Sequence, residues 1–166
     1  MTDPCFVDAN VFVHWRDPTD GVKYSRANDW MEQLWTQGTG RTSTQALSEF
    51  YTIITREVAK PLSKPDAWEY VESLIAWSPQ PVDSVVLVRA RQVEERYRLS
   101  WWDSLIVAAA QVQHCVLLLT EDLQDGAVYG SVTVRDPFRL SVQEAAATYG
   151  AAPAPRYRRR PSAMRD

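Results

Sequence analysis

Short apolar runs alternate along this chain with longer segments whose apolar residues recur every three or four positions. Runs 5–7 and 116–120 are short, apolar and followed directly by polar residues, which is typical of buried strands. Three weaker runs predict further short strands at 41–44, 81–82 and 132–134, the last of them at a sheet edge. The predicted strands are therefore spread over the whole chain.

The helical pattern predicts five elements of ten or more residues between these runs. They cover residues 24–35, 47–58, 65–77, 84–97 and 100–113. Because short strands alternate with helices, the sequence predicts an α/β fold with a short, mainly parallel sheet covered by helices on both faces. No polar stripe interrupts residues 105–110, so we expect the last of these helices to be buried on all sides.

Length and composition indicate one globular domain. The chain has 166 residues, of which 45% are hydrophobic and 23% are charged, so it is neither disordered nor fibrous. No apolar run approaches the roughly 20 residues of a membrane-spanning helix, and the first residues lack the pattern of a secretory signal. Cys5 and Cys115 stand in apolar surroundings without a CxxC pair, which favours buried thiols in a reducing compartment, and hence the cytoplasm.

Charge is distributed unevenly along the chain. The net charge is -3, but the last eleven residues hold five arginines and one aspartate, which leaves 13 basic against 20 acidic side chains in residues 1–155. A polyanionic partner must then be bound through local basic patches, the tail or bound cations. We expect the folded domain to span residues 1–149, and the proline- and arginine-rich tail, residues 150–166, to be disordered.

Acidic residues follow both of the stronger strands. Asp8 comes directly after the first strand, with Asn10 two positions on. Thr120 ends the second strand, with Asp122 two positions on. Parallel strands bring their carboxyl ends to one edge of the sheet, where ligands of open α/β sheets collect. Taken singly, Asp8 also fits a turn at the end of a strand, and Asp122 fits a cap or a turn before Leu123.

Two further acids lie on predicted helices. Asp103 stands three positions after Ser100, which is the spacing of a capping box at a helix start. A capping residue can also bind a metal ion, so the two interpretations are compatible. Glu49 lies nearly opposite the apolar face that Leu47 and Phe50 form, which is typical of a position facing solvent.

Four segments in order carry a resemblance to a known family. They are FVDANVFVH, TSTQALSEFYTII, LSWWDSLIVAAA and LLLTEDLQDG, and the likeness spans residues 5–138. Their order and spacing resemble the successive acidic motifs of PIN-domain ribonucleases, in particular the VapC-type toxins of bacterial toxin-antitoxin pairs. The resemblance implies a compact α/β/α sandwich that cuts single-stranded or loop RNA with the help of Mg²⁺ or Mn²⁺. It implies four metal-binding and catalytic carboxylates: Asp8, Glu49, Asp103 and Asp122. Asn10 and Thr120 match polar positions that support these ligands.

The physical chemistry of clustered carboxylates agrees with that implication. Carboxylates within ~4 to 6 Å raise one another's pKa values, and a hard divalent cation removes this cost. His14 and His114 are the only histidines, and neither has a Cys or His companion at zinc spacing. The donor set therefore favours Mg²⁺ over zinc.

The expected reaction is metal-assisted hydrolysis of a phosphodiester bond. We expect Asp8 and Asp103 to bind the metal directly. We expect Glu49 to bind through water or to orient the nucleophile, and Asp122 to hold a second ion or a water. One-metal and two-metal versions both fit the sequence.

The resemblance also implies partners: an RNA substrate, a second copy in a homodimer, and a small antitoxin whose C-terminal segment lies in a groove beside the acids. Helices 24–35 and 47–58 carry large apolar residues that suit such a groove, although these faces also suit packing on the sheet alone. The cations available for RNA phosphates are Arg16, Lys23, Arg26, Arg41 and the arginines of the tail. Core packing is favoured for most of the seven tryptophans, while Trp101 or Trp102 is in place to reach the cleft beside Asp103.

Three other functions fit the sequence less well. A phosphoacceptor signalling domain needs a lysine after a late strand, and none follows residues 116–120. A hydrolase with an aspartyl nucleophile needs a second aspartate where Asn10 stands. A catalytically silent RNA-binding or scaffold domain of the same fold is the main alternative, and the presence of all four candidate acids argues against it.

Overall fold

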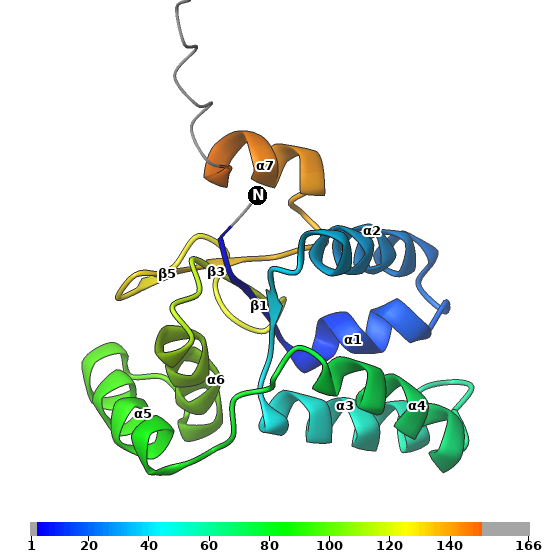
Figure 1. Cartoon of the computed structure of the whole chain (residues 1–166), viewed down its shortest axis with the longest axis horizontal. Coiled ribbons are helices and arrows are strands. Elements are labelled where there is room, and N and C mark those ends of the chain that lie inside the picture. Colours follow the sequence, from blue (N-terminus) through cyan, green and yellow to red (C-terminus); the bar gives the residue numbers. More distant parts are fainter. Residues whose placement is uncertain (1–2, 151–166) are drawn as a thin grey trace, which may run out of the picture.

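One five-stranded sheet forms the centre of the molecule (Figure 1). The computed structural model describes residues 3–150, so the tail predicted to be disordered lies, apart from Gly150, outside the described residues. The strands are β1 (Cys5–Val7), β2 (Gly40–Arg41), β3 (Leu117–Leu119), β4 (Val128–Tyr129) and β5 (Val132–Arg135). Their order in the sheet is β2-β1-β3-β5-β4, and every pairing is parallel except that of β4 with β5. The predicted α/β class with a mainly parallel sheet is confirmed.

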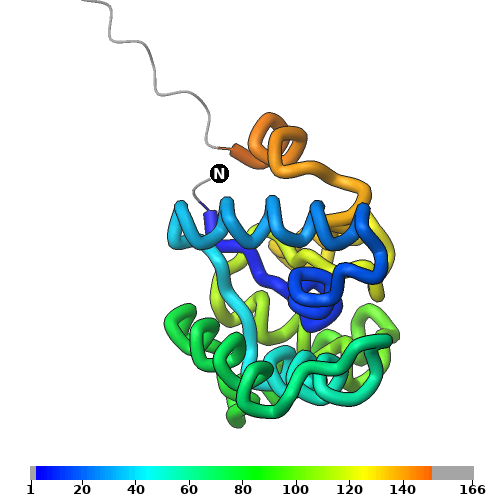
Figure 2. Tube along the Cα trace, turned by 90° about the vertical axis from the view of Figure 1, so that its right-hand side faces the viewer, coloured from blue at the N-terminus to red at the C-terminus, as the bar shows by residue number. Residues whose placement is uncertain are grey.

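Helices cover both faces of this sheet. Those within residues 3–150 are α1 (Ala9–Arg16), α2 (Gly21–Gln37), α3 (Thr44–Arg56), α4 (Lys64–Ile75), α5 (Ser84–Tyr97), α6 (Trp101–Val112) and α7 (Val142–Tyr149). Successive side chains of a strand point to opposite faces of the sheet, so each strand contributes to the core on both faces. Val7 and Leu119 share a core with α1 to α4 and α7, whereas Phe6 and Leu118 pack against α6 and the end of α5. Figure 2 shows α7 (orange) beside the long helix α2 (blue), with which it is in contact. The arrangement is an α/β/α sandwich.

Two expectations about burial are confirmed. In α6, every residue from Ser104 to Ala110 is buried, as the lack of a polar stripe predicts. Cys5 and Cys115 are buried free thiols, and burial raises the pKa of Cys115 to about 12. No helix among the described residues has the length and apolar character needed to cross a bilayer.

Two helices were not predicted, and both are short. The polar residues after β1, expected to form a turn, instead start α1, which buries Val11 and Phe12. Helix α7 is equally short and begins at a complete capping box of Ser141 and Glu144. With eight residues each, these helices span little more than two turns, so their apolar periodicity is too brief to separate from a turn.

The weaker strands differ in detail from the prediction. No strand forms at 81–82, where Gln80 makes an isolated bridge with Ser43 and Asp83 already caps α5. Pro81 has no N–H group for a ladder, which accounts for the loss. The strand expected at 41–44 is only β2, because Ser43 caps α3. Strand β5 is not at the edge, because β4 pairs on its outer side.

The register of β1 and β3 determines where the polar residues meet. Val7 pairs with Leu119, so the two parallel strands end at the same level. The amide of Asp8 donates a 3.1 Å hydrogen bond to the carbonyl of Leu119, which continues the pairing by one residue. Asp8 and Thr120, each one residue further on, therefore lie side by side at the carboxyl edge of the sheet.

Candidate active site

Asp8 is fixed at the junction of β1 and α1. Its backbone is extended (φ -85°, ψ 163°), and its Oδ1 accepts a 2.8 Å hydrogen bond from the amide of Ala9, so it caps the helix. The side chain is in place to interact with the positive end of the short α1 helix. Only 6% of the residue is exposed. Asp8 therefore caps a helix where the sequence predicted only a turn, and its second oxygen, Oδ2, remains for other partners.

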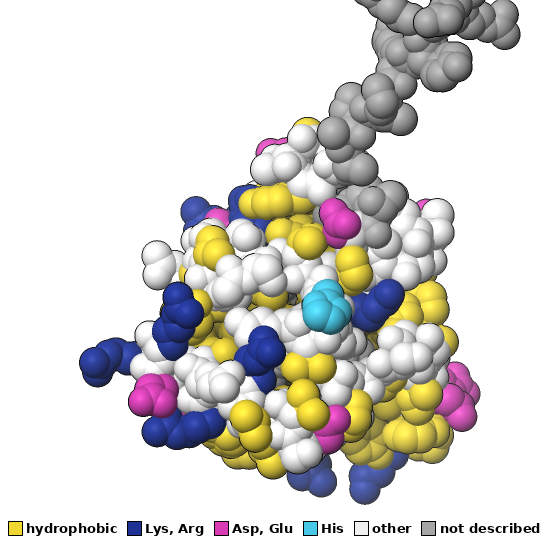
Figure 3. Space-filling view, turned by 60° about the vertical axis from the view of Figure 1, so that its left-hand side comes forward, with side chains coloured by type: hydrophobic (Ala, Val, Ile, Leu, Met, Phe, Trp, Pro, Cys, Tyr) yellow, Lys and Arg dark blue, Asp and Glu magenta, His cyan; other side chains and the backbone are white. Residues whose placement is uncertain are grey.

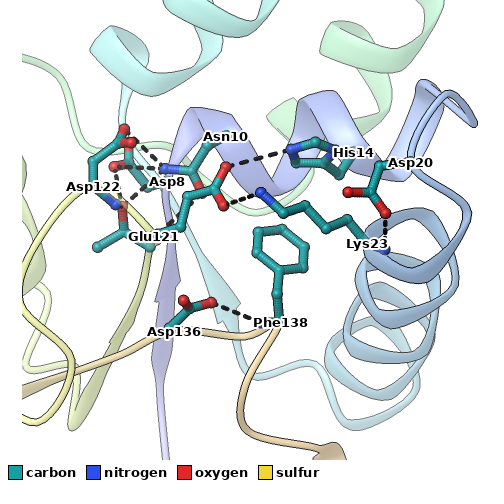
Figure 4. Close-up of polar contacts among 10 residues, drawn as sticks. Asp8, Asn10, His14, Asp20, Lys23, Glu121, Asp122, Asp136 and Phe138 are labelled. Atoms are coloured by element: carbon teal, nitrogen blue, oxygen red, sulfur yellow. Dashed lines mark hydrogen bonds and ion pairs between the residues drawn. The ribbon is translucent and has the colours of Figure 1, made fainter.

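Asn10, Thr120 and Asp122 join Asp8 in one hydrogen-bond network (Figure 4). The hydroxyl of Thr120 donates to Oδ2 of Asp8 at 2.9 Å and accepts from the amide of Asp122 at 3.1 Å. The Asn10 Nδ2 group donates to Thr120 Oγ1 at 2.9 Å and to Asp122 Oδ2 at 3.1 Å. Residues 110 positions and more apart in the chain are thereby linked across β1 and β3.

The buried carboxyl of Asp8 has a strongly shifted pKa. The pKa of Asp8 is raised from 3.8 to about 7, mainly by burial and also by the negative charges of Glu49 and Asp122. The hydrogen bonds from Ala9 and Thr120 act in the opposite direction and lower it. Near neutral pH this carboxyl is therefore only partly ionised, and a cation beside it would favour the ionised form.

Glu49 reaches this edge from the solvent side. It lies on α3 and is exposed, as the helical pattern predicts. Its Oε1 accepts a 3.2 Å hydrogen bond from Gln45 Nε2, and its charge is one of the two that raise the pKa of Asp8. Glu49 therefore acts on Asp8 through its charge, and it is not hydrogen-bonded to Asp8, Asn10, Thr120 or Asp122.

Asp103 lies in the first turn of α6, outside this hydrogen-bond network. Its amide donates to Ser100 Oγ at 3.1 Å, so Ser100 caps α6, but only this half of the predicted capping box is formed. Within residues 3–150, no hydrogen bond joins its carboxylate back to Ser100 or to the other three acids. Gln45 Nε2 donates both to Glu49 and, at 3.3 Å, to the carbonyl of Trp102, which brings the start of α6 near Glu49. The charge of Asp103 also contributes, after burial, to the raised pKa of Tyr129.

Two carboxylate groups beside Asn10 have the chemistry that a hard cation prefers. No group of three or more His, Cys, Asp or Glu side chains in the described part of the chain is arranged to hold a metal ion. Mg²⁺, however, usually takes only one or two protein carboxylates and fills its octahedron with waters and phosphate oxygens. The carboxylates of Asp8 and Asp122 flank the same amide group, Nδ2 of Asn10, at 3.5 and 3.1 Å. This all-oxygen pair, with one member buried and raised in pKa, fits Mg²⁺ or Mn²⁺.

A second polar cluster beside the network was not predicted from the sequence. Glu121 lies between Thr120 and Asp122, and its carboxylate accepts from Lys23 Nζ at 2.5 Å and pairs with His14 Nε2 at 3.4 Å (Figure 4). The His14 ring also packs edge-on against Phe138, at 5.0 Å between centroids. The loop after β3 is thereby tied to α1 and α2. His14 follows Asn10 by four residues, a spacing that would place both on one face of α1, but that helix was not expected.

The cations proposed for RNA binding are largely engaged within the protein. Lys23 pairs with Glu121, and the Arg16 guanidinium lies over the Tyr70 ring at 4.4 Å. Arg41 donates to the carbonyl of Gly40 at 2.8 Å. Trp102, beside Asp103, is 66% exposed and is the one of the two neighbouring tryptophans that faces solvent most.

The sequence match gives the family of the chain. The family model for the PIN domain matches residues 5–124, which is well over half of the chain and includes β1, β3 and all four candidate acids. The chain belongs to the PIN domain family, and the resemblance seen in the four motifs is confirmed.

Among solved structures, the fold is similar to that of VapC20 of Mycobacterium tuberculosis, which is described as a sarcin-ricin loop cleaving toxin. The TM-score is 0.53 at 16% sequence identity, over 71% of this chain and 89% of the VapC20 chain. At this identity the likeness concerns the fold. No curated protein sequence matches the chain.

Proposed function

We propose that this chain is a Mg²⁺-dependent endoribonuclease, with Mn²⁺ as a substitute ion, and that it is the toxin of a cytoplasmic type II toxin-antitoxin pair. The observation that carries the proposal is the buried Asp8, held against Thr120 and joined to Asp122 through Asn10 at the carboxyl edge of β1 and β3. Membership of the PIN domain family and the fold likeness to a toxin support the same class.

The side chains have distinct roles in the proposed site. Asp8 and Asp122 are the metal ligands that the geometry supports best, although the sequence alone favours Asp103 over Asp122. Asp103 and Glu49 complete the site, directly or through bound water. When bound, the ion supplies positive charge that ionises or orients a water and offsets the charge developing on the phosphate.

The chain's own residues keep this site ordered. Ala9 and Thr120 each donate to one oxygen of Asp8, which fixes the plane of the carboxylate. Asn10 and Thr120 hold the backbone and side chain of Asp122. Glu49, on the exposed side, is free to accept the proton of the water that attacks the phosphorus in line with the leaving oxygen.

A cleavage assay tests the proposal directly. The full chain is mixed with a structured RNA in Mg²⁺ or in EDTA, beside the variants Asp8→Asn and Asp29→Asn. Asp29 is an exposed aspartate on α2 and serves as the matched control. Cleavage that needs Mg²⁺ and falls at least about 100-fold in Asp8→Asn alone supports the site. Undiminished cleavage by Asp8→Asn contradicts it.

A catalytically silent RNA-binding or scaffold domain is the second candidate. One observation favours it: no three acidic side chains within residues 3–150 are arranged to hold a metal ion, and only Asp8 and Asp122 share the hydrogen-bond network. The same assay separates the two, because a silent domain binds RNA in EDTA and leaves it intact in Mg²⁺.

The proposed antitoxin has a suitable groove between α3 and α4. A groove of about 500 Å³ there is lined largely by apolar side chains, including Leu47, Tyr51, Trp68, Val71 and Ile75. Most apolar residues of α2 are buried in the core, although Val22 and Trp35 are exposed, so packing accounts for most of the apolar face of that helix. Co-expression with the neighbouring reading frame, compared with the chain alone, tests the proposal, and Trp68→Ala should weaken a complex that uses the groove. The oligomeric state of each preparation tests the proposed homodimer.

A further inference from the structure

A basic hollow on the described surface lies away from the acidic network. A cavity of about 460 Å³ opens between α5, the end of α6 and the turn from β4 to β5. Its polar lining consists of Arg89, Gln92, Arg96, Tyr97, Gln111, His114 and Ser131, and no Asp or Glu is among its lining residues. Figure 3 turns the side of the molecule that carries α5 and α6 toward the viewer, and several Lys or Arg side chains gather at the left of this face.

Two arginines of this basic groove have no acidic partner. Arg89 and Arg96 lie seven residues apart on α5, so both project on the groove side of the helix. Neither has a carboxylate within 4.0 Å among the described residues. By contrast, Arg91, which does not line the groove, pairs with Glu94 at 3.4 Å and Glu95 at 3.9 Å. The positive charge of the groove is thus left for a ligand outside the chain.

Neutral groups order the walls around these charges. Gln111 Nε2 donates to the carbonyl of Tyr129 at 3.0 Å, and its Oε1 accepts from Arg89 at 3.4 Å. The hydroxyl of Tyr97 accepts from the amide of Gly130 at 2.9 Å, which ties the β4–β5 turn to α5. These contacts use amide and hydroxyl groups, so they hold the groove without neutralising its charge.

We propose that this basic groove binds the phosphate backbone of RNA outside the acidic site. The proposal rests on the proposed ribonuclease function for the identity of the ligand. It meets a requirement of that function, because the body of the chain is acidic and most of the cations near the acids are engaged within the protein. An extended polyanion neutralises unpaired arginines and is bound without regard to sequence.

The position of the groove suits a structured RNA. His114 precedes β3, and Ser131 precedes β5, whereas Thr120 and Asp122 follow β3. The groove and the acids therefore lie toward opposite ends of β3, a strand of three residues that spans about 10 Å. An RNA stem-loop can contact the groove with one part of its backbone while another part enters the acidic site.

The test measures binding in EDTA, so that it does not depend on cleavage. A fluorescent RNA stem-loop is titrated with the full chain, with Arg89→Gln/Arg96→Gln, and with the control Lys60→Gln/Arg91→Gln at several salt concentrations. The control removes the same charge from two exposed residues that do not line the groove. We expect the groove variant to bind roughly tenfold more weakly at 50 mM salt and to reduce the slope of log K against log salt by about 1.5, since each phosphate contact contributes ~0.7 to 0.9. Melting temperatures within about 2 °C of wild type verify the fold.

Two results would overturn the groove proposal. One is RNA binding by the groove variant that equals that of the control. The other is loss of poly-glutamate binding in the groove variant with RNA binding unchanged, which assigns the groove to an acidic protein. The ribonuclease proposal fails on a different result, the absence of Mg²⁺-dependent cleavage. In that case the titration in EDTA still measures whether RNA binds to the groove.

Discussion

Thr120 donates a 2.9 Å hydrogen bond to the buried carboxyl of Asp8, from the end of one parallel strand to the end of its neighbour. The contact follows from the pairing of Val7 with Leu119, since each polar residue comes one position later. It stabilises the ionised form of a carboxyl whose burial raises the pKa to about 7. The site therefore combines an unfavourable buried charge with a hydrogen bond that partly offsets it.

The raised pKa of Asp8 predicts that Asp8→Asn stabilises the metal-free protein above neutral pH. The carboxyl titrates near 3.8 when unfolded and at about 7 when folded. Between these values the folded state binds more protons, so the contribution of Asp8 to stability falls as pH rises from about 4 to about 7. Asparagine has no such titration and caps a helix as well as aspartate does.

We expect Asp8→Asn to raise the free energy of unfolding at pH 8 by on the order of 3 kcal/mol, and the melting temperature by roughly 5 to 10 °C. The difference should shrink toward zero near pH 4. Thermal unfolding in EDTA from pH 4 to 8 measures both, with Asp29→Asn as the control that should follow wild type. Equal melting of wild type and Asp8→Asn at pH 8 would show that the pKa is not raised.

The hydroxyl of Thr120 predicts a difference between two small substitutions. Thr120→Val keeps the shape of the side chain but removes the 2.9 Å hydrogen bond to Asp8 Oδ2, which keeps only the 3.5 Å contact with Asn10 Nδ2, and leaves the Asp122 amide without a partner. We expect it to cost about 1 to 3 kcal/mol in urea unfolding at pH 8, because buried polar groups are left unpaired. Thr120→Ser keeps the hydroxyl and loses one methyl group, at about 1 kcal/mol or less. The hydrogen bond from Thr120 lowers the pKa of Asp8. Because the valine variant loses this bond and the serine variant keeps it, Asp8 should titrate at higher pH in the valine variant.

Which residues form this site could be predicted from the sequence better than how they are arranged. Asp8 and Thr120 follow strong strand signals, and parallel pairing alone brings them to one edge. The short helix α1 was missed, and with it the spacing that turns Asn10 toward Thr120 and His14 toward Glu121. Glu121 was overlooked because its partners come from α1 and α2, far away in the chain, and only the folded structure brings them near.

The helices likewise show that features set by local sequence could be predicted, whereas those set by tertiary packing could not. The burial of α6 could be predicted because its apolar residues leave no polar stripe. The strand expected at 81–82 did not form, because Pro81 lacks an N–H group and Asp83 caps the next helix. Whether the carboxylate of Asp103 meets the other acids depends on how the start of α6 lies against α3, which no local pattern determines.

Binding of Mg²⁺ should stabilise the wild-type protein and do so through Asp8. At a Mg²⁺ concentration about 100 times the dissociation constant, the gain is about 2.7 kcal/mol. We therefore expect Mg²⁺ to raise the melting temperature at pH 8 by roughly 5 to 10 °C in wild type and in Asp29→Asn. The shift should be absent in Asp8→Asn and reduced in Asp122→Asn. A full shift in Asp8→Asn would mean that the ion binds elsewhere on the acidic body.

Asp103 predicts a separation of stability from activity. Its carboxylate makes no hydrogen bond to the other acids in residues 3–150, and its amide alone takes part in the cap with Ser100. Asp103→Asn should therefore melt within about 2 °C of wild type in EDTA and leave the pH dependence due to Asp8 unchanged. If Asp103 completes the metal site, the same variant loses Mg²⁺-dependent RNA cleavage by at least about 100-fold and loses part of the Mg²⁺-induced rise in melting temperature. Full cleavage by Asp103→Asn would restrict the active site to Asp8, Asp122 and Glu49, whereas a large loss of stability in EDTA would mean that Asp103 has a structural role in α6.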